Sequence, residues 1–149
     1  MTLEIPHSLH GGHESLRATL RQAMREEGPL GEVARRLAQV IDGHMMREEK
    51  FVLRPLGILK ALARGDTPAD LADAQHLAEG LPRALPQMMD EHRQVAELVP
   101  LLAREAEAAG RLEFVGFAEE LLLHARLEEE VLYPAALLVG RYATLVRGG

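Results

Sequence analysis

Apolar residues recur along this chain in alternating steps of four and three, the spacing that places side chains on one face of an α-helix. Four segments show this pattern, and no segment alternates with the period of two that a strand requires. The four stripes comprise Leu9, His13, Leu16, Leu20 and Ala23; Leu37, Ile41, His44, Glu48 and Phe51; Leu85, Met88, His92, Val95, Val99 and Leu102; and Phe117, Leu121, His124, Glu128 and Val131. The excess of Leu and Ala over Ile and Thr also favours helix. We therefore predict an all-α protein that folds as a four-helix bundle.

Glycine and proline divide the chain into these four segments. Gly28-Pro29, Gly65 and Gly110 stand where the first three helices should end, because a helix C-terminus often needs a glycine. Thr67-Pro68-Ala69-Asp70 predicts the start of the third helix, and the Gly11-Gly12 pair predicts a late start for the first. Kinks or short interruptions are expected at prolines inside the helical patterns, namely Pro55, Pro82, Pro86, Pro100 and Pro134.

Composition limits the class of protein and its partners. The 149 residues are 47% hydrophobic and 27% charged, which fits a single domain over residues 1–149. Cysteine is absent, so disulfides, thiolate nucleophiles and cysteine-bound metals are excluded. The net charge of -6 argues against nucleic-acid partners and anionic membranes, which favour clustered Lys and Arg. Without a targeting segment or a long apolar run, we expect a cytoplasmic location.

Histidine is the residue type that points to chemistry, since the chain contains seven. Each stripe carries one His, and two stripes carry a Glu one turn later, so a bundle would bury four imidazoles and two carboxylates. Burying such groups without partners costs several kcal/mol for each charge, whereas a metal ion satisfies them. The predicted metal ligands are His13, His44, Glu48, His92, His124 and Glu128. Imidazole and carboxylate suit iron or manganese better than a structural zinc, which usually takes four ligands and often sulfur.

A weak internal repeat relates the two halves of the chain. His44 and Glu48 recur 80 positions later as His124 and Glu128, and His13 recurs after 79 positions as His92. This predicts two helix hairpins related by an approximate two-fold axis, with a dinuclear metal centre on the axis.

Four motifs occur in order along the chain: His13-Glu14, His44-x-x-x-Glu48-Glu49, Glu91-His92 and His124-x-x-x-Glu128-Glu129-x-x-x-Tyr133-Pro134. In this order and spacing they resemble the hemerythrin-like HHE domain, from about His10 to Pro134. The resemblance implies an up-down-up-down bundle with two iron ions, bridged by two carboxylates and an oxo or hydroxo group. Members of this family bind dioxygen or sense oxygen, nitric oxide or iron.

The chain departs from the oxygen-carrying hemerythrins at two places. Those proteins have two His one turn apart on the third helix, but here Met88 and Ala96 flank His92 at that spacing, so one iron lacks a His. They also use a carboxylate five residues after the fourth-helix His, which would be Glu129, whereas the spacing on the second helix favours Glu128. The position of the absent histidine could be taken by His10, by Glu91, by water or by no ligand, and the sequence leaves these alternatives open. These departures favour sensing, redox chemistry or iron handling over reversible oxygen carriage.

Residues beside the motifs receive structural interpretations. Glu49, Glu129 and Glu130 are expected on solvated helix faces, Glu91 as a surface acid, and His7 and His76 as exposed histidines. We expect Met45, Met46, Met88 and Met89 to fill the core. Phe51, Phe117 and Leu121 are expected to form an apolar wall that keeps water away from the metals. Tyr133 either hydrogen-bonds to a ligand or lies at the edge of the bundle.

Three functions follow as alternatives. The first is a di-iron protein that binds or senses dioxygen, nitric oxide, peroxide or iron status, with zinc or manganese as possible substitutes. The second is a di-iron enzyme with peroxidase-like or ferroxidase-like activity. A homodimer is one expected assembly, since a sensor of this length would act through a separate protein or through dimerisation. The third is a zinc-bound or metal-free bundle that acts through protein contacts. Its apolar docking stripe would consist of Leu137, Leu138, Val139, Tyr142, Leu145 and Val146.

Overall fold

The computed structural model describes residues 3–148, and in this range the chain forms helices and loops with no strand. The α-helices are α1 (His7–Met24), α2 (Pro29–Glu48), α3 (Leu59–Ala63), α4 (Leu71–Ala108), α5 (Leu112–Leu127) and α6 (Tyr133–Gly148). Two π-helical turns, η1 (Glu49–Leu53) and η3 (Glu128–Leu132), and one 3₁₀ turn, η2 (Pro55–Ile58), complete the elements. The all-α prediction is confirmed.

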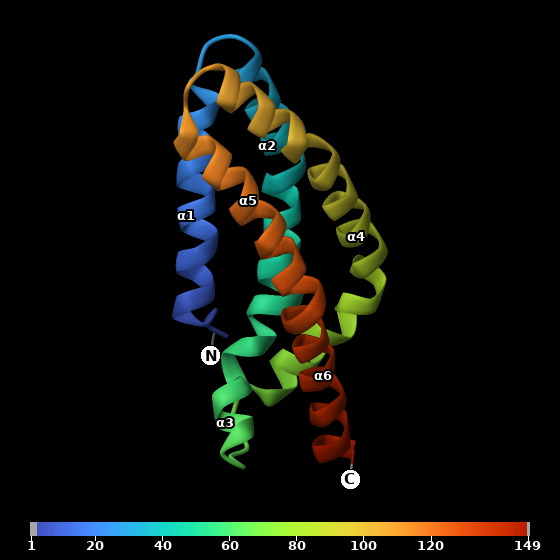
Figure 1. Cartoon of the computed structure of the whole chain (residues 1–149). Helices are drawn as coiled ribbons and strands as arrows, with labels where there is room; N and C mark the ends of the chain where they lie inside the picture. Colours follow the sequence, from blue (N-terminus) through green and yellow to red (C-terminus); the bar gives the residue numbers. More distant parts are fainter. Residues whose placement is uncertain (1–2, 149) are drawn as a thin grey trace.

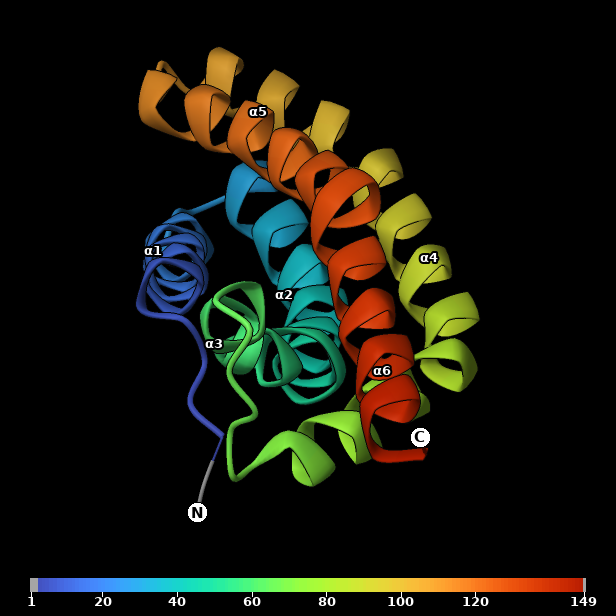
Figure 2. The same cartoon turned by 90° about the horizontal axis from the view of Figure 1, so that it is seen from below.

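Four long helical segments pack side by side (Figures 1 and 2). The first is α1, the second is α2 continued by η1, the third is α4, and the fourth is α5 continued by η3 and α6. Successive segments run in opposite directions, so the predicted four-helix bundle is confirmed, with up-down-up-down order (Figure 1). No helix within residues 3–148 has the length and apolar character that crossing a lipid bilayer requires.

Glycines at two helix ends behave as predicted. Gly65 (φ 86°) and Gly110 (φ 71°) each lie one residue beyond the C-cap of the preceding helix, in the left-handed conformation that glycine adopts without strain. Gly28 is different, because α1 ends at Met24 and Gly28 (φ 74°) is the N-cap of α2.

Two predicted helix starts are wrong. First, α1 begins at His7, so the Gly11-Gly12 pair lies inside the helix. Each helical glycine costs about 1 kcal/mol relative to Ala, and the burial of His13, Leu16 and Leu20 on the same helix outweighs that cost. Second, α4 begins at Leu71, since the Leu71 N–H donates to the carbonyl oxygen of Pro68 in a separate turn.

Prolines have two different effects on the helices. The long α4 contains Pro82, Pro86 and Pro100 and is still assigned as one helix, which curves along its length (Figure 1). By contrast, Pro55 and Pro134 each follow a π-helical turn. A proline ring clashes with the carbonyl group four residues before it, and in both places that carbonyl belongs to the widened turn.

These π turns shift the helical register by about one residue. Continuing the stripes through Glu48 and Glu128 predicts Phe51 and Val131 as buried, but Phe51 is half-buried and Val131 is 51% exposed. The next residues along the chain are buried instead, namely Val52 and Leu53 after η1 begins, and Leu132 and Tyr133 at the end of η3. A turn closed by i→i+5 bonds contains one extra residue, which explains the shift.

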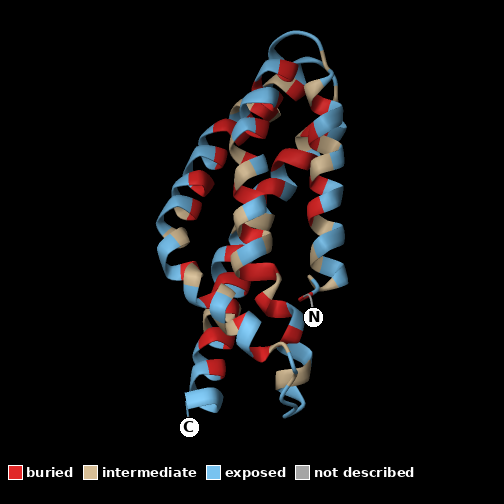
Figure 3. Cartoon of the chain, turned by 180° about the vertical axis from the view of Figure 1, so that it is seen from behind, coloured by how far each residue is buried: buried red, intermediate tan, exposed pale blue. Residues whose placement is uncertain are grey.

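Two hydrophobic cores fill the bundle, one on each side of a polar layer. Buried residues are spread along the length of the bundle (Figure 3). One core includes Leu37, Val99 and Phe114, and the other includes Val52, Leu81 and Val139. The buried polar and charged residues are His13, His44, Glu48, Glu91, His92 and Glu128. Along the long segments these residues lie where one core gives way to the other, with His44 next to Met45 of the first core.

Candidate metal centre

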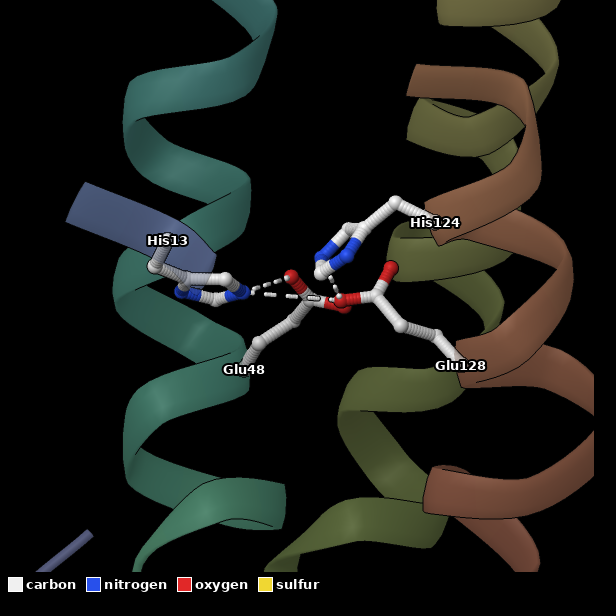
Figure 4. Close-up of side chains that lie close together, drawn as sticks. All are labelled: His13, Glu48, His124 and Glu128. Atoms are coloured by element: carbon white, nitrogen blue, oxygen red, sulfur yellow. Dashed lines mark ion pairs between the residues drawn. The ribbon is translucent and has the colours of Figure 1, made fainter. Parts of the chain in front are cut away.

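All six predicted ligands meet in this polar layer. The first group, formed by His13, Glu48, His124 and Glu128, offers one atom from each residue within 4.8 Å of the others (Figure 4). The second group consists of His44, Glu48, His92 and Glu128 and meets the same criterion. Each group therefore contains two imidazoles and the same two carboxylates.

Helical spacing accounts for part of this arrangement. His44 and Glu48 lie one turn apart on the second long segment, and His124 and Glu128 do the same on the fourth. Within each pair, a carboxylate oxygen lies close to the imidazole Nε2, at 3.3 Å on the second segment and 3.0 Å on the fourth. Both glutamates stand at the junction with a π turn, a feature that is frequent at functional sites.

The two carboxylates divide their oxygens between the two groups. Oε1 of Glu48 lies 3.4 Å from Nε2 of His13, while its Oε2 lies 3.3 Å from Nε2 of His44. Oε2 of Glu128 lies 3.0 Å from Nε2 of His124, and its Oε1 lies 3.0 Å from Nε2 of His92. A carboxylate that presents one oxygen to each of two neighbouring imidazole groups has the geometry needed to bridge two metal ions.

Hydrogen bonds leave several atoms of this layer unsatisfied. Nε2 of His13, His44 and His124 and Oε2 of Glu128 are buried and have no hydrogen-bond partner among the described residues. Buried polar atoms are normally paired, so a cluster of unpaired nitrogen and oxygen atoms around two carboxylates fits a site for cations. The residues present therefore fit two metal ions held by imidazole and carboxylate.

Outer partners orient two of the imidazoles. Nδ1 of His44 donates to Oε1 of Glu91 at 3.0 Å, and Arg47 forms an ion pair with the same glutamate. Nδ1 of His13 lies 3.4 Å from Oε1 of Glu49, which accepts a 2.9 Å contact from Arg17. Such contacts hold the Nδ1–H tautomer and direct Nε2 toward the centre. Arg17 and Arg47 were missed by sequence reasoning, although each lies about one turn after the histidine it supports.

Four further glutamates differ in their surroundings. Glu91 is 6% exposed, so the prediction of a surface acid is wrong: Arg47 neutralises the charge and His44 supplies a hydrogen bond. Glu49 is half-buried by the same kind of pairing and does not lie on a fully solvated face. The solvated positions of Glu129 and Glu130 are confirmed, with Glu129 3.4 Å from Nδ1 of His92.

Electrostatics strongly favour positive charge in this layer. Burial alone would lower the pKa of His13 and of His44, but the close carboxylates of Glu128 and Glu48 favour the protonated imidazoles, outweigh burial and raise each pKa to about 9. Burial would raise the pKa of Glu128, but hydrogen bonds with Glu48 and the surrounding imidazoles hold that pKa well below its usual range. Metal cations would satisfy the same demand for positive charge.

Tyr133 joins the layer from the start of α6. Its hydroxyl donates to Oε2 of Glu48 at 2.5 Å and lies 3.2 Å from Nε2 of His92. Of the two interpretations open from the sequence, the structure supports a hydrogen bond to a predicted ligand.

A cavity of about 20 Å³ lies against the two groups. Its polar lining is His44, Glu48, His92, His124 and Glu128, and its apolar lining is Ile41, Met45, Val95, Leu121 and Ala125. The predicted apolar wall is therefore present at Leu121. Phe51 instead faces Gly80, whose missing side chain makes room for the ring. We call this space the inner cavity.

Several other predictions concern residues around the layer. His7, His10 and His76 are exposed, and neither metal group includes His10, Glu91 or Glu129. Met45 and Met88 are buried as expected, but Met46 is 68% exposed, so its assignment to the core is wrong. In the predicted docking stripe, Leu138, Tyr142, Leu145 and Val146 are exposed while Val139 is buried.

The fold and the polar layer together define a four-helix bundle with buried His/Glu groups that could hold metal ions. Comparisons of the chain with protein-family models, with curated proteins and with solved structures find no match.

Proposed function

We propose that this protein is a non-haem di-iron protein of the hemerythrin-like kind, which binds or senses dioxygen, nitric oxide or the redox and iron status of its surroundings. One observation carries the proposal: Glu48 and Glu128 each present one oxygen to each of two imidazole pairs. That is the donor arrangement for two adjacent ions that share two carboxylates. The order of His and Glu motifs along the chain supports the same family.

The donor set favours iron among the common metals. Nitrogen and carboxylate oxygen without sulfur suit iron or manganese in six-coordinate geometry. With four protein donors in each group, positions remain for outside ligands. Bound iron would supply affinity for dioxygen or nitric oxide and the capacity to exchange electrons with them.

The chain itself controls what reaches the centre. The inner cavity of about 20 Å³ is bordered by five of the proposed ligands, so little space would remain beside the ions, which suits a diatomic ligand and excludes larger organic substrates. Its apolar side chains Ile41, Val95 and Leu121 keep bulk water away from the histidines. Glu91 and Glu49 hold two imidazoles in place, and Tyr133 holds Glu48 through the hydroxyl proton.

Anaerobic reconstitution with Fe(II) tests the proposal. Metal analysis should find about two iron ions for each chain, and exposure to dioxygen or nitric oxide should produce charge-transfer absorption that the metal-free protein lacks. Retention of zinc alone, or of no metal, would overturn the proposal. The control is a His76→Ala variant, whose exposed histidine lies outside the layer and should leave both results unchanged.

A peroxide-reducing or iron-oxidising enzyme is the second candidate. The remaining coordination positions favour it, because a substrate such as peroxide could occupy them. Sustained consumption of peroxide, with the absorption bands preserved through many turnovers, would support the enzyme. A single stoichiometric reaction that bleaches the bands would support binding or sensing.

A further inference from the structure

The approximate two-fold relation between the halves breaks down behind two matching histidines. His44 and His124 correspond through the repeat, and both direct Nε2 at the centre. Behind His44, the ion pair of Glu91 and Arg47 covers the imidazole, whose side chain is 6% exposed. The side chain of His124 is 22% exposed, the largest exposure among the four histidines of the layer.

Two substitutions within the repeat explain this exposure. Applying the same offsets, the position that corresponds to Glu91 is Gly12, and the position that corresponds to Arg47 is Leu127. No described residue donates to or accepts from Nδ1 of His124 through a side chain. A Cβ atom built on Gly12 would have no heavy atom within 4 Å, so the space behind His124 is open.

This space is a pocket of about 480 Å³ between α1 and α5, which we call the outer pocket. Its lining is Gly12, Ser15, Leu16, Glu120, Leu123, His124 and Leu127. His124 lines both the outer pocket and the inner cavity, so its imidazole stands between solvent and the centre.

The lining of the outer pocket selects by chemistry. It is mainly apolar, and its one charged residue, Glu120, repels anions. On the opposite flank of α5, a second pocket of about 270 Å³ shares His92 and Ala125 with the inner cavity, but Arg93, Arg126 and Glu129 make it charged. Small neutral molecules of low polarity partition better into the outer pocket.

We propose that the outer pocket is the entrance through which a neutral diatomic gas reaches the inner cavity. On this route the gas passes the imidazole of His124, which lines both spaces. The choice of a gas rests on the proposed function, whereas the position of the entrance rests on the missing Glu–Arg pair behind His124.

Dissolved dioxygen is paramagnetic, so methyl NMR relaxation under oxygen pressure tests the entrance in the metal-free protein. The methyl groups of Leu16, Leu123 and Leu127 should relax faster than those of Leu112 and Leu145, which are exposed away from the outer pocket. In Gly12→Leu, the new side chain fills the pocket, so the faster relaxation of the pocket methyl groups over the reference methyl groups (the relaxation excess) should disappear. The matched control is Ala96→Leu, which places the same side chain beside the pocket on the other flank. An excess that persists in Gly12→Leu, or that disappears in Ala96→Leu, would overturn the proposal.

Rates of nitric oxide combination with the iron-loaded protein provide a second readout. Gly12→Leu should slow the combination about tenfold, equivalent to about 1.4 kcal/mol on the barrier, and Ala96→Leu should leave it unchanged. The double variant Gly12→Glu with Leu127→Arg copies the Glu–Arg ion pair behind His44 and should slow the combination rate as much as Gly12→Leu does. Equal rates in all variants would reject the entrance while leaving the di-iron function standing. If no metal binds at all, the function fails, and the relaxation measurement still decides the entrance.

Discussion

The hydroxyl of Tyr133 donates a 2.5 Å hydrogen bond to Oε2 of Glu48, joining two residues 85 positions apart. The tyrosine ring also stacks on His92, with ring centroids 5.7 Å apart. Burial and the negative charge of Glu48 raise the pKa of Tyr133 above its usual range, so the phenol keeps its proton. The contact depends on the π turn η3, because the extra residue in that turn rotates Tyr133 into the layer.

Replacing this tyrosine should weaken the fold without removing metal. Tyr133→Phe leaves a buried carboxylate oxygen of Glu48 without its donor, which should lower the free energy of unfolding by about 1 to 3 kcal/mol. Denaturant titration measures the change. Tyr142→Phe is the control, since Tyr142 is 44% exposed, and it should change stability by less than about 0.5 kcal/mol. Equal effects of the two substitutions would show that the bond to Glu48 contributes little.

The pair of Glu91 and Arg47 should tune metal affinity rather than supply a ligand. Glu91→Gln removes the charge that holds Nδ1–H of His44, and loss of such an outer partner typically lowers metal affinity by about 10-fold to 100-fold. Competition with a chelator measures this affinity. Asp90→Asn changes an exposed neighbour and should have no effect. Complete loss of one ion in Glu91→Gln would instead identify Glu91 as a direct ligand.

The shared carboxylates should be more critical than any single imidazole. Glu128→Ala removes an oxygen from both groups, so we expect both ions to be lost. His44→Ala affects one group, and we expect about one ion to remain. Metal analysis of the two proteins, together with their thermal unfolding, checks this order, because metal binding is coupled to folding. Unchanged stoichiometry in both variants would refute the ligand assignment.

Stability of the metal-free protein should fall as pH rises above neutrality. The pKa values of His13 and His44 are raised from 6.5 to about 9 in the folded state, so the folded protein binds more protons than the unfolded chain between these values. The resulting stabilisation is complete below pH 6.5 and is lost as pH rises through about 9.

Urea unfolding of chelator-treated protein across this pH range measures the effect. Glu128→Gln should flatten the dependence, because the substitution removes one of the charges that raise both pKa values. Metal affinity should change in the opposite direction, rising with pH as the imidazoles lose the protons that compete with metal. A metal-free protein whose stability is constant from pH 6.5 to 9 would contradict the pairing described for His13 and His44.

Helical periodicity was sufficient to predict most of the layer. The stripes placed His13, His44, His92 and His124 on inward faces, and the two His-x-x-x-Glu spacings placed Glu48 and Glu128 beside them. All six residues meet in the structure. Prediction worked here because a regular helix relates sequence position to direction through a constant angle. The same rule failed at Phe51 and Val131, where the π turns change that angle.

Local spacing and composition were enough to predict the helical class, the four-segment division and most of the side chains that face the bundle interior. Which distant residues touch could be known only from the packed helices. The contacts of Glu91 with His44, of Glu49 with His13 and of Tyr133 with Glu48 join different helices. Their geometry depends on how the helices pack and on register shifts at the two π turns, and neither property can be calculated from the spacing within one helix.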